Sequence, residues 1–234
     1  GKMTFGTGSS VMTTLADYIV PPDGITTTIA WSISGRPTFA FEGNILVSAS
    51  IFPWTAELLG LENVEALLSL AETVEDTGGV SLVPAHVGLG SPRWDADARG
   101  LVCGLSFASK PAHIARAAAE SLAFQVRDVY AIMAEAAGHV GRISVDGGPS
   151  RNRFLMQLVA DYLDRPVTPC RNAEASAIGA AHLAGLAVGF WPDLEALATL
   201  AQREPEITPS MAAERRDRSI GEWTKAIART TFAV

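Results

Sequence analysis

The stretch RISVDGGPSRNRFLMQLVADYLDRPVT, residues Arg142–Thr168, decides the fold class of this chain. With the small-residue segment that follows, it predicts a strand, a glycine turn, a helix, a strand and a helix, over Arg142–Val145, Asp146–Gly148, Ser150–Leu163, Pro166–Thr168 and Glu174–Val188. Two strands that are joined through a helix by short loops require a right-handed crossover and parallel pairing. The pattern therefore indicates an α/β fold.

The first 43 residues are rich in β-branched and aromatic residues bounded by Gly and Pro, which is typical of half-buried strands. The predicted strands are Lys2–Phe5, Ser9–Thr14, Gly24–Ser32 and, after a Gly35-Arg36-Pro37 turn, Thr38–Phe41. Helices are predicted over Asn44–Leu59 (bent or divided at Pro53), Val64–Ala71, Pro111–Ala137 and parts of Asp193–Thr230, and short strands over Val80–Pro84 and Leu101–Leu105. We expect antiparallel strands followed by βαβα units, all around one mixed sheet.

Composition excludes several classes of protein. The chain has 234 residues, 48% hydrophobic and 18% charged, which is the ordinary range of globular domains. Its net charge of -7 argues against nucleic acid or an anionic membrane as a partner. The chain contains neither a long uncharged apolar run nor a leader-like segment, and its two cysteines form no CxxC pair. We therefore expect a cytoplasmic protein.

Gly6-Thr7-Gly8 follows the first predicted strand directly. Glycines allow close backbone approach, and successive N–H groups in such a turn form an anion-binding nest. The turn rules alone favour an ordinary hairpin, so both interpretations stay open at this point.

The segment VDGGPSRN, residues 145–152, ends a strand in an acid and two glycines and then starts a helix. Such an end directs free amides and the positive end of a helix dipole toward a ligand. A tight turn that is capped by Ser150 explains the same residues equally well. The segment lacks the Lys-Ser/Thr of a P-loop and the third glycine of the dinucleotide fingerprint.

The segment GLGSPRWDADARG, residues 88–100, is the longest irregular stretch. Asp95 and Asp97 suit either magnesium coordination or Asx-turn caps, and turn chemistry favours the caps. The four histidines, His86, His113, His139 and His182, have no metal-ligand spacing.

Six segments occur in an order that resembles the C-terminal half of the FGGY carbohydrate kinases, among them the glycerol kinases and xylulokinases. They are TFGTG, FEGNI, VPAHVGLGSPRWDADARG, GLSFASKPAHIARAAAESLAFQVRD, VDGGPSRNRFLMQLVADYLDRPV and EASAIGAAHLAGLAVGFW. The resemblance runs nearly end to end. Each piece is weak by itself, whereas six in the same order are strong evidence.

The resemblance implies a ribonuclease H-like domain of the actin/hexokinase type, with ATP and Mg²⁺ as cofactors. Residues 1–234 would be the C-terminal, nucleotide-binding domain, and the N-terminal kinase domain would lie outside this chain. The residues that the resemblance places at the nucleotide are Gly6, Thr7 and Gly8 at the phosphates, Gly147, Gly148 and Asn152 around the adenosine, and Ala49 beside the nucleotide. Ala49 stands where the family commonly has glycine, and Pro53 stands where it often has glutamine.

The resemblance also implies that the catalytic aspartate precedes the first strand, so we expect no catalytic residue in this chain and no turnover by the domain alone. The expected substrate is a small sugar or polyol, and the expected full-length enzyme is a homo-oligomer. A non-catalytic actin-like nucleotide-binding or regulatory module is the alternative, and a structural domain without a ligand is the third reading.

Ser10 bears on the substrate. Glycerol kinases usually have an aromatic residue two positions beyond the Gly-Thr-Gly turn, where it packs on the glycerol carbons. Ser10 leaves room and offers a hydroxyl there, which predicts a longer substrate such as a tetritol or a pentulose.

Overall fold

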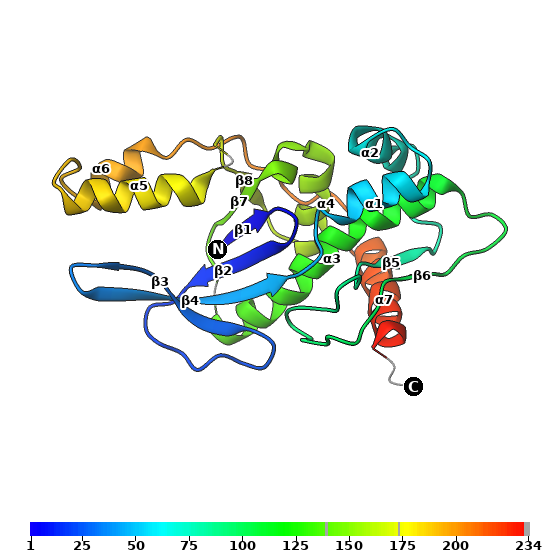
Figure 1. Ribbon diagram of the computed structural model, residues 1–234, viewed down its shortest axis with the longest axis horizontal. Coiled ribbons are helices and arrows are strands. Elements are labelled where there is room, and N and C mark those ends of the chain that lie inside the picture. The colour runs from blue at the N-terminus through cyan, green and yellow to red at the C-terminus, as the bar shows by residue number, and fades with distance from the viewer. Residues whose placement is uncertain (139, 173, 232–234) are drawn as a thin grey trace.

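The computed structural model describes residues 1–138, 140–172 and 174–231 and is built around a six-stranded mixed sheet (Figure 1). The strands are β1 (Lys2–Phe5), β2 (Ser9–Thr14), β3 (Thr26–Ile33), β4 (Arg36–Ile45), β7 (Ile143–Gly147) and β8 (Val167–Pro169). Their order across the sheet is β3-β4-β2-β1-β7-β8. β1 to β4 pair antiparallel, whereas β1 with β7 and β7 with β8 pair parallel. The predicted α/β class, with antiparallel strands followed by βαβα units, is confirmed.

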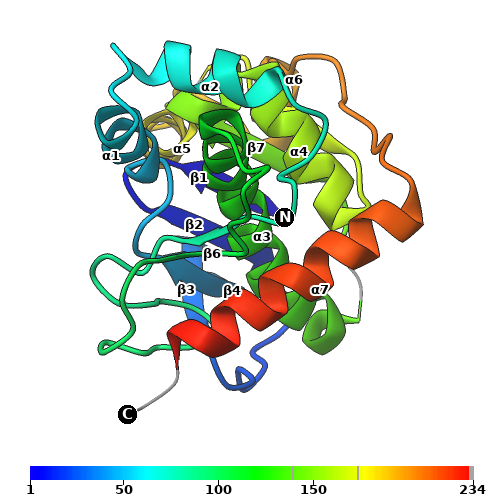
Figure 2. The ribbon, with the colours of Figure 1, turned by 90° about the vertical axis from the view of Figure 1, so that its right-hand side faces the viewer.

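The helices surround this sheet in two groups. They are α1 (Ile51–Leu58), α2 (Val64–Glu72), α3 (Pro111–Ala137), the short 3-10 helix η1 (Gly148–Arg151), α4 (Arg153–Leu163), α5 (Ala175–Ala187), α6 (Leu194–Leu200) and α7 (Ala213–Thr230). The long helix α3 packs against α2, α4 and the sheet, and α7 lies beside it (Figure 2). α5 and α6 form a separate pair over the arm made by β3 and β4 (Figure 1).

α3 covers one face of the sheet only. A Cβ atom on Gly43 of β4 would overlap Val129 of α3, so position 43 faces that helix. Because neighbouring residues of a strand point to opposite faces, Glu42 and Asn44 face the other side. β2 alternates in the same way: Ser9, Val11 and Thr13 are buried, whereas the residues between them are only half buried. We call the side opposite α3 the open face of the sheet.

Two predictions for the helix expected over Asn44–Leu59 are wrong. The helix expected from Asn44 begins only at Ile51, because Asn44 and Ile45 continue β4 in register with β2. Pro53 is the third residue of α1, where a helix has no acceptor for an N–H group, so it neither bends nor divides the helix.

The hairpin between β3 and β4 also turns elsewhere than predicted. It turns at Ser34 and Gly35, both with positive φ (52° and 76°), so Arg36 and Pro37 belong to β4 rather than to the turn. Two consecutive residues with positive φ give the backbone twist that two-residue hairpins favour. In addition, β5 (Ser81–Val83) and β6 (Leu101–Cys103) form a small sheet of their own instead of joining the main one.

The long loop over residues 88–100 is anchored to the core. Arg93 Nη2 donates to Asp128 Oδ2 of α3 at 2.8 Å, and Trp223 Nε1 of α7 donates to the same oxygen at 2.9 Å. Trp94 Nε1 donates to the carbonyl of Gly24 at 2.9 Å. One buried carboxylate therefore joins the loop, α3 and α7.

Candidate functional site

Two of the glycine turns leave the sheet side by side. β1 and β7 are parallel neighbours, and Phe5 pairs with Gly147 in their register. The Gly6 turn follows β1 directly, and η1 starts at Gly148 directly after β7. Both turns therefore lie at the carboxyl ends of adjacent parallel strands, where open α/β sheets bind their ligands.

The Gly6–Gly8 turn is anchored through its carbonyl groups, which accept hydrogen bonds from residues 48–50. The amide of Ala49 donates to Gly6 O at 3.1 Å, and the amide of Ser48 donates to Thr7 O at 2.9 Å. Ser50 Oγ donates to Thr7 O as well, at 2.9 Å. These bonds bring Ala49 and the start of α1 against the turn.

Two of the three N–H groups of this turn remain free among the described residues. Gly6 N donates to Gly8 O at 2.8 Å, whereas the amides of Thr7 and Gly8 have no acceptor among the described residues. Thr7 is exposed, and its hydroxyl makes no hydrogen bond within the described part of the chain. Two consecutive free amides beside a free hydroxyl are suited to an anionic oxygen.

Glycine is required at two of the predicted site positions for reasons of local geometry. A Cβ on Gly8 would come within 2.5 Å of Ile45 O. Gly147 has φ of 90°, and a Cβ there would overlap the Phe5 carbonyl. Gly148 differs from both, because a Cβ on it meets no heavy atom within 4 Å. Close backbone contacts explain why Gly8 and Gly147 are glycines. No such contact requires glycine at position 148, where a side chain would meet open space.

Asn152 is the N-cap residue of α4. Its Oδ1 accepts from the amide of Leu155 at 2.9 Å, which leaves its Nδ2 group without an acceptor in the described residues. Ser150, the cap that the sequence suggested, instead donates from Oγ to Gly147 O at 2.7 Å and so closes η1. A donor and a helix N-terminus therefore stand next to Gly148.

The open face carries two carboxylates that were not predicted as site residues. Glu42 Oε1 accepts from Ser10 Oγ at 3.2 Å. Asp146 is 1% exposed, its Oδ2 lies 3.4 Å from Lys2 Nζ, and its Oδ1 has no donor among the described residues. Both occur within segments that were examined only for their glycines, FEGNI and VDGG.

The described residues do not offer a metal centre of their own. They contain no group of three or more His, Cys, Asp and Glu side chains that could hold an ion. Asp95 Oδ1 accepts from the amides of Asp97 and Ala98, so it forms the Asx-turn that was the favoured interpretation. His139 lies outside the described residues. None of the described helices is long and apolar enough to cross a membrane.

The fold and the two side-by-side turns are those of an actin-like ATPase domain. Residues 1–188 match the model of the FGGY family of carbohydrate kinases, C-terminal domain, and the chain belongs to this family. Apulose kinase of Pectobacterium atrosepticum is 44% identical over 229 residues, which are 97% of this chain and 46% of that protein. Glycerol kinase 1 of Streptomyces avermitilis is 42% identical over 98% of this chain and 46% of its own length. The chain thus spans about half the length of the curated relatives it matches.

Solved structures give the same result. The crystal structure of Plasmodium falciparum glycerol kinase with ADP superposes with a TM-score of 0.90 at 29% identity, over 100% of this chain and 47% of that one. The xylulose kinase of Rhodospirillum rubrum superposes with a TM-score of 0.83 at 27% identity, over 97% of this chain and 46% of its own.

Proposed function

We propose that this chain is the nucleotide-binding half of an ATP-dependent kinase that phosphorylates a sugar or polyol. The observation that carries the proposal is the pair of free amides on Thr7 and Gly8, next to the bare surface of Gly148. Similarity to a glycerol kinase whose structure was solved with ADP supports an adenine nucleotide as the ligand.

The residues have separate roles in this proposal. The Gly6–Gly8 turn receives phosphate oxygens through its amides and the Thr7 hydroxyl. Gly148 gives the adenosine a flat surface without a side chain, and the Asn152 Nδ2 group donates to its polar edge. Ala49 lies beside the phosphate turn, because its amide donates to Gly6 O. ATP supplies the phosphoryl group that is transferred.

The residues present do not fit a protein-held magnesium site. Amides and a hydroxyl at the turn complement anionic oxygens rather than a cation, and the described residues include no metal-ligand cluster. Kinases commonly hold Mg²⁺ between nucleotide phosphates and a carboxylate. We therefore assign no magnesium ligand to this chain and no catalytic base either.

The substrate proposed for the whole enzyme is a tetritol or a pentulose rather than glycerol. Ser10 and Glu42 form a polar pair on the open face, close to the phosphate turn along β2. Hydroxyl and carboxylate groups bind substrate hydroxyls, whereas an aromatic residue at position 10 would cover the carbons of a short polyol. A relative that phosphorylates apulose, 44% identical to this chain, is consistent with that preference.

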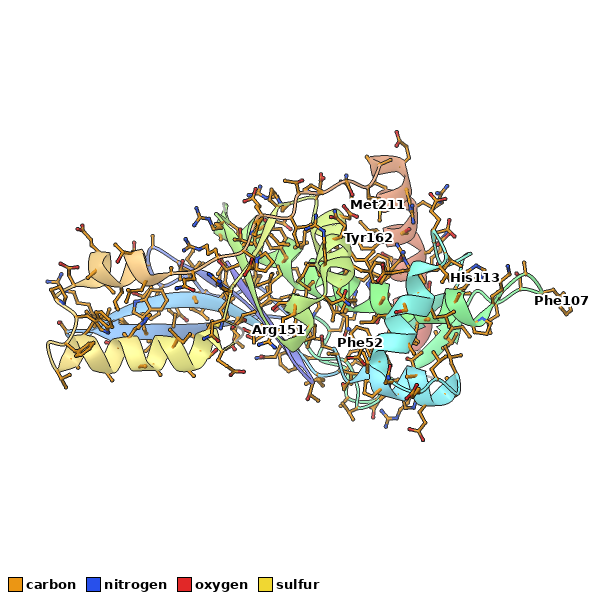
Figure 3. All side chains as sticks on the ribbon, turned by 90° about the horizontal axis from the view of Figure 1, so that it is seen from above. Phe52, Phe107, His113, Arg151, Tyr162 and Met211 are labelled. Atoms are coloured by element: carbon orange, nitrogen blue, oxygen red, sulfur yellow. The ribbon has the colours of Figure 1, made fainter. Side chains whose placement is uncertain are left out.

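The proposal includes a cytoplasmic full-length enzyme that self-associates. An apolar loop tip supports self-association: Phe107, between β6 and α3, is fully exposed at one end of the molecule (Figure 3), and Leu105, two residues before it, is 58% exposed. The mass of the full-length protein in light scattering tests this part of the proposal.

The function itself is tested by an assay of the full-length protein. We expect saturable binding of ADP in calorimetry and ATP-dependent phosphorylation of a tetritol or pentulose. Binding without turnover of any sugar or polyol would favour the non-catalytic nucleotide-binding module. If neither ADP nor ATP bound, the proposal would be wrong and a structural domain would remain.

A further inference from the structure

Arg151 shares one side of the short helix η1 with Gly148. η1 begins at Gly148 and ends at Arg151, and a 3-10 helix has about three residues in each turn, so these two positions lie on the same side of it. A rise of about 2.0 Å per residue separates them by about 6 Å along the helix axis. The Arg151 side chain therefore starts one turn away from Gly148, on the side that Gly148 leaves bare.

The space beside Gly148 is not filled by this arginine. A Cβ atom built on Gly148 meets no heavy atom within 4 Å, the side chain of Arg151 included. Seen from above, Arg151 lies near the middle of the molecule, between the α5–α6 pair and the helices around α3 (Figure 3). A long, flexible side chain thus stands next to open space at the carboxyl end of β7.

The guanidinium group of Arg151 has no partner in the described part of the chain. Arg151 is exposed, and it takes part in neither a side-chain hydrogen bond nor an ion pair there. Arg153, the first residue of α4, is exposed and unpaired in the same way. Acidic residues outnumber Lys and Arg in this chain, 25 to 18, yet none of those described pairs with either arginine.

The chemistry of a guanidinium group suits an aromatic ring. It is planar and weakly hydrated, and it stacks on aromatic faces more readily than an ammonium group does. A ring that lies between two groups makes a van der Waals contact of about 3.5 Å on each side, so it needs about 7 Å between them. The arginine side chain is long enough to widen its separation from Gly148 to that value.

We propose that the guanidinium of Arg151 stacks on the adenine ring of the nucleotide and holds it against Gly148. This inference rests on the proposed function, because it takes the ring to be that of ADP or ATP. Arg151 is then a residue that binds the base, separate from the phosphate contacts of the Gly6–Gly8 turn.

Calorimetry of ADP binding to the full-length protein tests the role of Arg151. We expect Arg151→Ala to weaken ADP binding about fivefold, because the stacking partner of the ring is lost. Arg153→Ala is the matched control: it removes the same charge beside the same helix N-terminus and should change the affinity less than about twofold. An equal loss in both variants would assign the effect to charge in general and would overturn the proposal.

Arg151→Lys separates stacking from charge. Lysine keeps the positive charge but has no planar group to lie on a ring. We expect this variant to bind ADP at least about threefold more weakly than the wild type. Wild-type affinity in Arg151→Lys would show that charge alone matters at this position, and the stacking proposal would then be wrong.

A double variant tests whether Arg151 and Gly148 contact the same ring. Gly148→Ala displaces the ring from one side, so less stacking remains for Arg151→Ala to remove from the other. We expect the loss of ADP affinity in the double variant to be smaller, by at least about twofold, than the product of the two single losses. Losses that simply multiply would place the two residues on different parts of the ligand and would contradict the proposal.

The failure of this inference can be told from the failure of the proposed function. If the wild-type protein binds no ADP, the proposed function is wrong. If it binds ADP and Arg151→Ala binds it equally well, only the role of Arg151 is refuted. Position 151 is exposed, so both single variants should keep the wild-type midpoint in urea. Arg151→Lys decides the question if the alanine variant does not fold.

Discussion

At the scale of single residues, the two adjacent glycines after β7 have different functions. Gly147→Ala forces a positive φ on alanine and places its Cβ against the Phe5 carbonyl, so we expect a loss of about 3 kcal/mol in the free energy of unfolding. Gly148→Ala meets no heavy atom within 4 Å and should leave that free energy unchanged.

Gly148→Ala should instead weaken ADP binding about tenfold, which corresponds to about 1.4 kcal/mol, because its methyl group occupies the proposed adenosine surface. Urea denaturation and calorimetry on the two variants measure both quantities. Unchanged ADP affinity in Gly148→Ala would contradict the assignment of this surface.

A buried carboxylate makes stability depend on pH. Burial raises the pKa of Glu120, against the opposing effect of Arg116, whose Nε donates to it at 2.7 Å. Tyr162 Oη donates to the other carboxylate oxygen at 2.8 Å and favours the charged form. A carboxyl whose pKa is raised on folding contributes most stability below its unfolded pKa of 4.5, and that contribution is lost as the pH rises through the folded pKa.

Tyr162→Phe removes the donor, so the pKa of Glu120 should rise further. We expect a loss of about 2 kcal/mol at about pH 8 and a clearly smaller loss at about pH 5. Urea unfolding at the two pH values measures the difference. An equal loss at both would show that the hydroxyl does not act through the charge of Glu120.

Ser10→Phe tests the substrate proposal. In the full-length enzyme the ring would cover the polar pair of Ser10 and Glu42. We expect kcat/KM for the preferred tetritol or pentulose to fall at least about tenfold relative to that for glycerol, because the room and the hydroxyl are lost together. Steady-state kinetics with both substrates measures the ratio, and wild-type preference for glycerol would refute the proposal directly.

At this scale the sequence indicates candidate site positions, but it does not show what each residue does for the fold. The glycine pattern predicted turns at Gly6–Gly8 and Gly147–Gly148. The structure places both turns at the carboxyl ends of the adjacent parallel strands β1 and β7. The fold requires a glycine where a Cβ atom would overlap the neighbouring strand, as at Gly147. A single sequence does not contain that distance. Asp146 and Glu42 were missed for the same reason, since their importance comes from burial and from partners on other strands.

At the scale of elements, α7 depends on one tryptophan. Trp223 is 1% exposed, stacks on Phe124 of α3 at a centroid distance of 5.2 Å and donates to Asp128. Trp223→Ala should cost about 3–5 kcal/mol in the free energy of unfolding. Lys225→Ala, at an exposed position of the same helix, is the control and should cost less than about 0.5 kcal/mol. Denaturant melts of both variants measure this; a small loss in Trp223→Ala would show that α7 is held by other contacts.

Elements with strong periodicity could be predicted from the sequence, and those that depend on neighbours could not. α3 begins and ends as expected, because its apolar stripe and Pro111 define it locally. The start of α1 was misplaced, because pairing with β2 extends β4 through Ile45 although local composition favours a helix. β5 and β6 were found as strands, but their separate sheet is a matter of tertiary packing.

At the scale of the whole molecule, two surfaces have groups without partners among the described residues. One lies at the carboxyl ends of β1 and β7, and the other is the groove between α5 and the sheet. At the carboxyl ends of β1 and β7, the free amides of Thr7 and Gly8 and the Nδ2 group of Asn152 are donors that suit a nucleotide. The groove between α5 and the sheet is lined mainly by apolar residues. The chain matches the C-terminal domain of its family and spans about half the length of the curated relatives it matches.

The turns at the ends of β1 and β7 form the proposed adenine-nucleotide site. Hydrogen exchange on the full-length protein with and without saturating ADP tests it most directly. We expect slower exchange upon ADP addition in peptides containing residues 6–8, 49 and 147–152, with no change in the β3–β4 hairpin. ADP binding that leaves these peptides unchanged and protects another surface would contradict it.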